Sequence, residues 1–109
     1  MMAFNVFLTE DASRDLEELY DYVPSRDAPG KADYVLSQIE KAFSSLTQNP
    51  ERRAYPKELS AIGLLEHREI FFKPYRIICR VMAENVFVMV IVDGRRDMQT
   101  LLQRRLLEA

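Results

Sequence analysis

Seven consecutive apolar residues, Val86 to Val92 (VFVMVIV), constrain the fold of this chain more than any other stretch. A strand that is apolar on both faces is buried on both, so it belongs in the middle of a sheet. The preceding stretch, Tyr75 to Met82, has the alternation of a strand. A tight turn joins the two, with Glu84-Asn85 at its tip, because Asn tolerates the left-handed backbone that such turns need. Since Gly94 breaks the second strand, Lys73 to Asp97 is predicted to form a central hairpin with a short C-terminal extension.

Arginines gather on this hairpin. Arg76 and Arg80 share one face of the first strand, and Arg95 and Arg96 follow directly after the second. We expect four guanidinium groups at one end of the sheet, where bidentate contacts can hold phosphates or carboxylates. General acid–base work needs a group that titrates nearer neutrality, so such a cluster suits binding better than cleavage. In the alternative, Arg76 and Arg80 pair internally, for example with Glu69 on the facing strand.

The first half of the chain predicts one strand and two helices. Phe4 to Leu8 is a short strand, and Thr9 can cap a helix that runs to Val23. The acidic face of this helix is expected to be solvated. A second amphipathic helix runs from about Ala28 or Lys31 to Gln48. Two helices joined by a short loop form an antiparallel hairpin, whose shared apolar side needs a sheet to cover it.

The second half supplies the rest of the sheet and a last helix. Residues 49–63 have no clear period, and their basic residues around Tyr55 either clamp a nucleic-acid backbone or belong to a polar crossover with one anchoring ring. Leu64 to Phe72 is a third strand. Asp97 is an N-cap candidate for a helix from Met98 to about Leu107. Arg105 lies on the apolar stripe of that helix, where it either snorkels or meets the carboxylate of a partner.

The element order is therefore β-α-α-β-β-β with a short C-terminal helix, which is an α+β fold. The sheet is expected to be small and mostly antiparallel, with the N-terminal helical hairpin packed on one face. Strand 86–92 is placed between strand 75–82 and the N-terminal strand. At 109 residues the chain is expected to form a single domain, 1–109.

Composition narrows the possible chemistry. The net charge of −2 divides into −5 for residues 1–50 and +3 for residues 51–109. This division fits either a solvated acidic helix or a basic face for an acidic partner. His67 is the only histidine and Cys79 the only cysteine, so we expect no metal, no cofactor and no disulfide. His67 is expected to be a half-exposed strand residue. No signal peptide and no membrane-spanning run are recognised, which predicts a cytoplasmic protein.

The whole chain resembles the RelE/ParE superfamily of toxins from bacterial toxin–antitoxin modules. The resemblance rests on the element order, an arginine–proline loop, Pro50 after the second helix, Tyr75-Arg76-Ile77, and the apolar strand that ends in Gly94-Arg95-Arg96-Asp97. It implies a compact toxin that a cognate antitoxin neutralises. RelE-type members are ribosome-dependent messenger-RNA endonucleases, whereas ParE-type members resemble them in fold but trap DNA gyrase and block replication.

The nuclease set is incomplete in this chain. Arg76 and Arg96 match the nuclease arginines, and His67 is a further candidate if the chain is a nuclease. The lysines expected on the strand before Tyr75 are absent, and Leu102 stands near where the nuclease tyrosine would fall. Without groups to move the proton, RNA cleavage is disfavoured.

The resemblance therefore favours a ParE-type toxin with no catalytic residues, which acts on DNA gyrase, functions in plasmid stabilisation and is neutralised by a ParD-like antitoxin. The alternative is a RelE-like messenger-RNA endonuclease. Neither membrane association nor sequence-specific nucleic-acid binding is expected. The candidate partner-binding residues are Arg76, Arg80, Arg95, Arg96, Tyr20, Tyr34 and Arg105.

Overall fold

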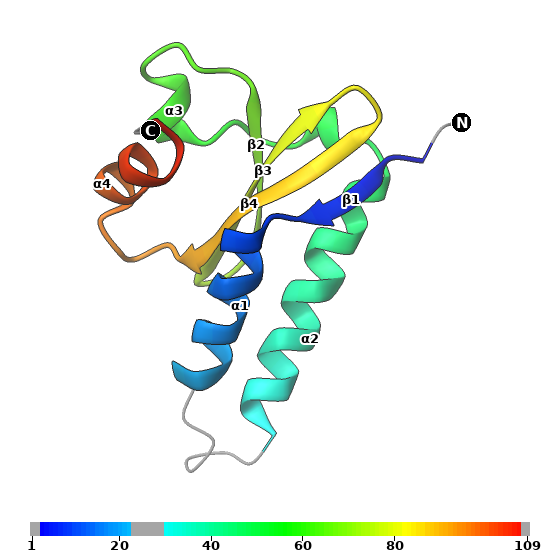
Figure 1. Ribbon diagram of the computed structural model, residues 1–109, viewed down its shortest axis with the longest axis vertical. Helices are drawn as coiled ribbons and strands as arrows, with labels where there is room; N and C mark the ends of the chain where they lie inside the picture. Colours follow the sequence, from blue (N-terminus) through cyan, green and yellow to red (C-terminus); the bar gives the residue numbers. More distant parts are fainter. Residues whose placement is uncertain (1–2, 23–29, 108–109) are drawn as a thin grey trace.

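The computed structural model describes residues 3–22 and 30–107. Its sheet has the strand order β1-β4-β3-β2, in which β1 runs parallel to β4 and the other neighbours are antiparallel. The long helices α1 and α2 lie side by side along one face, and the short helices α3 and α4 lie at the other side of the sheet (Figure 1). In chain order the elements are β1 Asn5–Leu8, α1 Glu10–Tyr22, α2 Lys31–Ser44, η1 Ser45–Thr47, η2 Pro50–Arg52, α3 Lys57–Ser60, β2 His67–Phe72, β3 Tyr75–Met82, β4 Asn85–Asp93, α4 Met98–Leu102 and η3 Gln103–Leu107.

These observations confirm the predicted α+β class, the element order and the mostly antiparallel sheet. They also confirm that the apolar strand β4 lies between β3 and β1. None of the helices within residues 3–22 and 30–107 is long and apolar enough to cross a membrane.

The residues of β4 change faces part of the way along the strand. Val86 and Val88 belong to the core cluster beneath α1 and α2, whereas Val90 and Val92 belong to the cluster beneath α3 and α4. The switch follows from a β-bulge, at which Met89 is an extra residue opposite β3. Because both faces of the strand are covered in this way, its sequence is apolar throughout.

The first helix begins where the sequence predicts. The Thr9 hydroxyl accepts a hydrogen bond from the Ala12 amide at 3.1 Å and donates one to the Val88 carbonyl at 3.0 Å. This cap attaches α1 to the inner strand directly after β1 ends. Asp97 likewise caps α4, because its carboxylate accepts from the Thr100 amide at 3.2 Å, as predicted.

Several boundaries differ from the predictions. The hairpin turns at Ala83-Glu84, and Ala83 instead of Asn85 has the left-handed backbone, with φ 56°. The reason is the register, since Asn85 already pairs with Met82 in the ladder and cannot be part of the loop. The third strand begins at His67 and not at Leu64.

The predicted helices also end differently. The second helix is α-helical only to Ser44 and then tightens into η1, and the last helix is α-helical to Leu102 and then widens into the π-helical turn η3. The stretch 49–63, predicted to lack a period, contains the short helices η2 and α3. The predicted end of the first helix at Val23 and the start of the second at Ala28 lie outside the described residues.

Candidate functional site

Arg76 is buried in an ion-pair cluster that we call the inner clamp (Arg76, Glu58 and Glu69). Its Nε and one terminal nitrogen donate to Glu69 Oε2 at 2.9 and 2.7 Å, and both terminal nitrogens donate to Glu58 at 2.8 Å. The residue is only 7% exposed. The two carboxylates raise the pKa of Arg76, and the Arg76 guanidinium lowers the pKa of Glu58. Burial raises the pKa of Glu69, although Arg76 opposes this shift. Internal pairing with Glu69, the alternative considered for Arg76, is therefore confirmed.

The inner clamp leaves no space for a side chain at position 94, which is a glycine. A Cβ on Gly94 would lie 2.7 Å from Cδ and 2.8 Å from Cγ of Arg76, and 3.1 Å from the Pro74 carbonyl oxygen. The Gly94 amide donates to that same carbonyl at 2.8 Å. The backbone thus passes directly over the stem of Arg76, which leaves no room for a side chain.

The predicted gathering of four arginines at one sheet end is wrong. Arg76 pairs across the sheet with Val92, near the end of β4, whereas Arg80 pairs with Phe87, toward the hairpin turn. Arg80 forms an exposed ion pair with Glu66 at 2.7 Å. The two arginines are four positions apart along β3, which corresponds to ~13 Å at the usual rise per residue.

The two arginines after β4 make different contacts. Arg95 turns back onto Asp93, at 2.6 Å, and lowers the pKa of that carboxyl. Arg96 instead lines the space between α1 and α4. Both arginines nevertheless line a second cavity together with Asp93, and the charges of both lower the pKa of that carboxyl.

Arg105 forms a second internal cluster, the edge clamp (Arg105, Asp15 and the β4 backbone). Its terminal nitrogens donate to the two Asp15 oxygens at 3.1 Å, and one of them donates to the Met89 carbonyl at 2.9 Å. Asp15 in turn accepts from the Ile91 amide at 3.0 Å. Since β1 ends opposite Val88, this part of β4 lacks a neighbouring strand, and the two side chains satisfy its backbone.

The edge clamp corrects two expectations. Asp15 was expected on a solvated acidic face, but it is only 8% exposed. Arg105 was expected to snorkel or to meet a partner's carboxylate, and instead it meets Asp15 of its own chain. Arg105 and Asp15 are 90 positions apart, so no local pattern could have revealed the pair.

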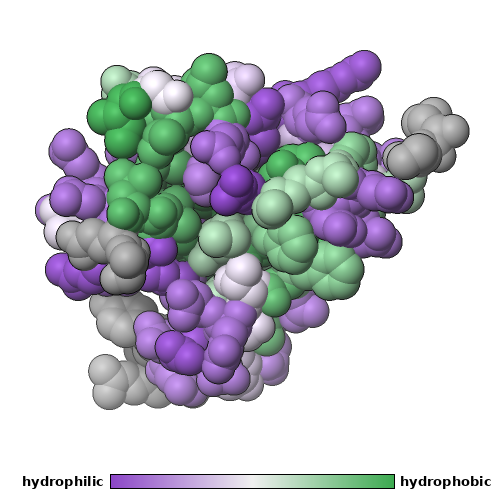
Figure 2. Space-filling view, turned by 45° about the horizontal axis from the view of Figure 1, so that its top comes forward, coloured by the Kyte–Doolittle hydropathy of each residue, from purple (hydrophilic) through white to green (hydrophobic). Residues whose placement is uncertain are grey.

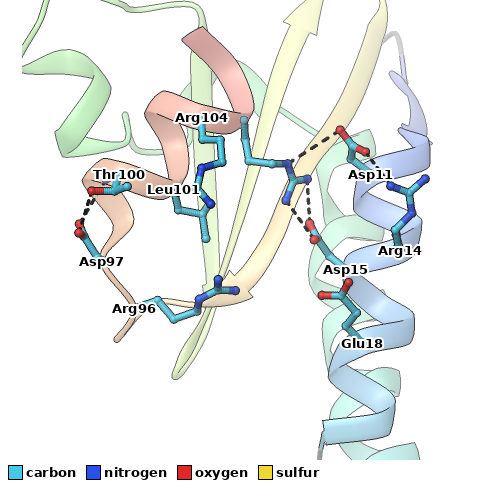
Figure 3. A pocket seen from close by; sticks show the side chains of 10 residues that line it. Asp11, Arg14, Asp15, Glu18, Arg96, Asp97, Thr100, Leu101 and Arg104 are labelled. Carbon is cyan, nitrogen blue, oxygen red and sulfur yellow. Dashed lines mark hydrogen bonds and ion pairs between the residues drawn. The ribbon is translucent and has the colours of Figure 1, made fainter. Parts of the chain in front are cut away.

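A polar groove, the α1–α4 groove, lies beside the edge clamp (Figure 3). Its cavity of about 400 Å³ has α1 on one side and α4 with its flanks on the other. Arg96 and Arg104 enter it from the α4 side, and Glu18 stands on the α1 side. Within residues 3–22 and 30–107, none of these three side chains makes an ion pair or side-chain hydrogen bond. The groove is lined by Asp11, Arg14, Asp15, Glu18, Arg96, Asp97, Thr100, Leu101, Arg104 and Arg105.

Sequence reasoning selected Arg96 but missed Arg104 and Glu18. A signal was present, because Arg96, Thr100 and Arg104 are spaced four residues apart and so share one face of a helix. A second cavity of about 400 Å³ continues the groove past Arg96 toward Tyr75, and it shares Asp15 and Glu18 with the first.

A second, more apolar groove lies on the other side of α1, between α1 and α2. Its cavity is about 750 Å³. Tyr20 is 43% exposed on its rim, and a hydrogen bond to Asp33 raises the pKa of its hydroxyl. Tyr34 is also exposed and packs edge-on against Phe72 instead of lining the cavity. The lining residues are Leu8, Ser13, Leu16, Glu17, Tyr20, Asp21, Leu36, Glu40 and Phe43.

The exposed surface also carries apolar side chains away from the grooves. Figure 2 shows hydrophobic residues gathered over one part of the surface, with hydrophilic ones around them. Exposed large apolar residues outside the helical hairpin include Phe7, Ile62, Leu65, Met82 and Leu107, and Phe7 stacks on Phe87.

The remaining candidates are structural. His67 is 8% exposed, not half-exposed as expected, and burial lowers its pKa. Burial raises the pKa of the Cys79 thiol to about 11, which leaves it unreactive at neutral pH. Tyr55 stacks under the Arg68 guanidinium at 4.0 Å, so this ring anchors the crossover. No group of three or more His, Cys, Asp or Glu residues in the described parts of the chain is arranged to hold a metal ion.

Comparisons with known proteins define the class. The family model of the ParE toxin of type II toxin–antitoxin systems (parDE) matches residues 6–98. The chain therefore belongs to the ParE toxin family, within the RelE/ParE superfamily that its sequence resembles. It is a ParE-type toxin of a type II toxin–antitoxin system. Among curated protein sequences, no significant match was found.

Solved structures share the fold at low sequence identity. The chromosomal ParDE system from P. aeruginosa matches with a TM-score of 0.68 and 19% identity, over 84% of this chain and 96% of that one. The RelBE2 complex from Mycobacterium tuberculosis matches with a TM-score of 0.56 and 22% identity, over 85% and 93%. A mutant of E. coli RelE in the free state matches with a TM-score of 0.58 and 18% identity, over 96% and 100%.

Proposed function

We propose that this ParE-type toxin inhibits DNA gyrase by binding it, without nuclease chemistry of its own, and that a ParD-like antitoxin neutralises it. The inner clamp carries the proposal. By the family resemblance Arg76 matches an arginine of the RelE-type nucleases, but here both edges of its guanidinium are occupied by Glu58 and Glu69. To contact a phosphate, it would have to leave the buried carboxylate of Glu69 and the mostly buried carboxylate of Glu58 without a cation, which is strongly unfavourable.

The separation of the other nuclease candidates supports the same proposal. His67 pairs across from Arg80, four positions along β3 from Arg76. Arg96 lies in the α1–α4 groove, whose lining residues do not include those of the inner clamp. A nuclease needs its groups within hydrogen-bond reach of one phosphodiester, and the spacing of His67 and Arg76 along the sheet does not favour this.

The α1–α2 groove is the surface we assign to the antitoxin. It combines five apolar or aromatic side chains with an acidic rim formed by Glu17, Asp21 and Glu40. An amphipathic helix with basic residues beside its apolar stripe complements such a groove. Tyr20 supplies an exposed aromatic contact at its edge. Antitoxin and toxin both act in the cytoplasm in this proposal.

The test is expression of the toxin without its antitoxin. We expect filamentation and DNA-damage signalling in cells, and accumulation of gyrase–DNA cleavage complexes with purified gyrase. Co-expression of the antitoxin encoded beside the toxin gene should restore growth. Normal growth, or arrest with intact DNA, would contradict the proposal.

A RelE-like messenger-RNA endonuclease is the second candidate, because two of the similar solved structures are RelE-type proteins. It predicts codon-dependent cleavage of messenger RNA on the ribosome that is lost on substitution of Arg76 and His67. Primer extension on ribosome-bound messages from the induced cells separates the two candidates.

A further inference from the structure

We propose that the α1–α4 groove is the contact site for the gyrase protein, and that it takes a segment in which a carboxylate and a basic side chain lie next to each other. Arg96 and Arg104 bind the carboxylate, and Glu18 binds the basic group. The inference rests on the proposed function and names a site for it.

The first support is that Arg96 and Arg104 are available to bind a carboxylate of another protein. Arg14, Arg76, Arg80 and Arg105 are each paired with carboxylates of this chain. Arg96 and Arg104 have no such partner among residues 3–22 and 30–107, although both point into the same cavity (Figure 3). Two convergent guanidinium groups without carboxylates have the geometry that binds a carboxylate from outside.

The second support is that the backbones of both arginines are already held in place. The Arg96 amide donates to the Asp93 carbonyl at 3.3 Å, and the next residue, Asp97, caps α4. Arg104 directly precedes Arg105, whose side chain is bound in the edge clamp. Only the side chains of Arg96 and Arg104 must become ordered on binding, which lowers the entropic cost.

The third support is the negative charge of the α1 side chains on the opposite wall of the groove. Asp11, Asp15 and Glu18 of α1 face the two arginines across the groove. Asp15 is bound by Arg105, and Asp11 lies 3.6 Å from Arg14, so Glu18 is left to receive a cation. The unpaired carboxylate of Glu18 disfavours a polyanion such as DNA or RNA, whereas it complements a protein segment that carries both charges.

The composition of the α1–α4 groove indicates that its occupant is a different protein from the antitoxin. Leu101 is the only aliphatic residue among the ten that line it, whereas the α1–α2 groove is half apolar. An amphipathic helix gains little in the polar groove, which instead favours a charge-steered, salt-sensitive contact with a target. We therefore assign the two sides of α1 to two different proteins.

The test compares charge reversals in the full-length toxin. The variant R96E/R104E should raise the toxin concentration needed to inhibit supercoiling by purified gyrase by about tenfold or more. The matched control is K41E/R52E, which makes the same change in net charge at two exposed positions outside both grooves. It should inhibit like the parent. Thermal unfolding of each variant verifies that the fold is intact.

Glu18→Lys distinguishes a mixed-charge protein segment from a purely anionic ligand. We expect weaker gyrase inhibition, because the basic group of the segment loses its partner. Stronger inhibition by Glu18→Lys would overturn the proposal and point to DNA.

Three other results are decisive. Unchanged inhibition by R96E/R104E would overturn the proposal, and if the same variant lost affinity for the antitoxin, the occupant would be the antitoxin instead. An equal loss of gyrase inhibition in K41E/R52E would mean that the effect depends only on net charge, and this result would also overturn the proposal. If the parent toxin does not inhibit gyrase at all, the proposed function itself fails, together with this site.

Discussion

Two arginines of this fold are held in clamps of their own chain, and two line an open groove. Arg76 and Arg105 each bind carboxylates of their own chain, whereas Arg96 and Arg104 have none among the described residues. All four come from the second half of the chain, and three lie within ten residues of one another. In this chain, an arginine is therefore available for a partner only where no carboxylate of the described residues forms an ion pair with it.

The largest expected effect comes from the inner clamp. Arg76→Ala leaves Glu58 and Glu69 without their cation in a site where both are mostly buried, which should lower the free energy of unfolding by about 3–5 kcal/mol. Urea denaturation measures this change. Arg96→Ala is the matched control from the open pair and should stay within about 0.5 kcal/mol of the parent. Equal losses of unfolding free energy in the two variants would show that clamped and open arginines do not differ in their contribution to stability.

The edge clamp should contribute less, because Arg105 keeps partial exposure. Asp15→Ala removes the acceptor of the Ile91 amide and the partner of Arg105, and we expect a loss of about 1–3 kcal/mol. Asp15→Asn keeps an acceptor for the amide and should lose less. A double-mutant cycle with Arg105→Met isolates the coupling between the two side chains, and additive losses would mean that they do not stabilise each other.

Gly94 tests how closely the backbone depends on the inner clamp. Gly94→Ala places a methyl group 2.7 Å from the Arg76 stem, which two carboxylates hold in place, so we expect a loss of about 1–3 kcal/mol. In an Arg76→Ala background the stem is gone, and the same substitution should cost less. Full additivity in denaturation experiments would indicate that Gly94 is required for another reason.

The smallest effect concerns His67. Burial lowers its pKa in the folded protein, so the unfolded chain binds the proton more readily. The stability that neutral His67 contributes is present above its unfolded pKa of about 6.5 and is lost as the pH falls below that value. His67→Gln should therefore flatten the decline of the unfolding free energy between pH 7 and pH 5.5. An unchanged slope would assign the decline to other groups.

Much of the fold was predictable because it depends on local patterns. The apolar run of β4, the alternation in β3 and the stripes of α1 and α2 identify their elements, and Thr9 and Asp97 cap the helices where they were expected. The inner place of β4 follows as well, because only an inner strand buries both faces. The candidate site was less predictable: Arg96 was selected for its place after β4, but Arg76 and Arg105 were selected with it.

The α+β class, the strand order around β4 and the family resemblance follow from local patterns in the chain, because hydrophobic periodicity acts over neighbouring residues. Which arginines are available depends instead on how the elements pack. Glu58 reaches Arg76 from 18 positions away along the chain, and Asp15 reaches Arg105 from 90 positions away. Whether a charge is paired depends on such distant approaches, which follow from the packing of α1, α3 and α4 against the sheet. Arg96 and Arg104 remain open because that packing places no carboxylate of the described residues within ion-pair distance of them, although acidic side chains line the same groove.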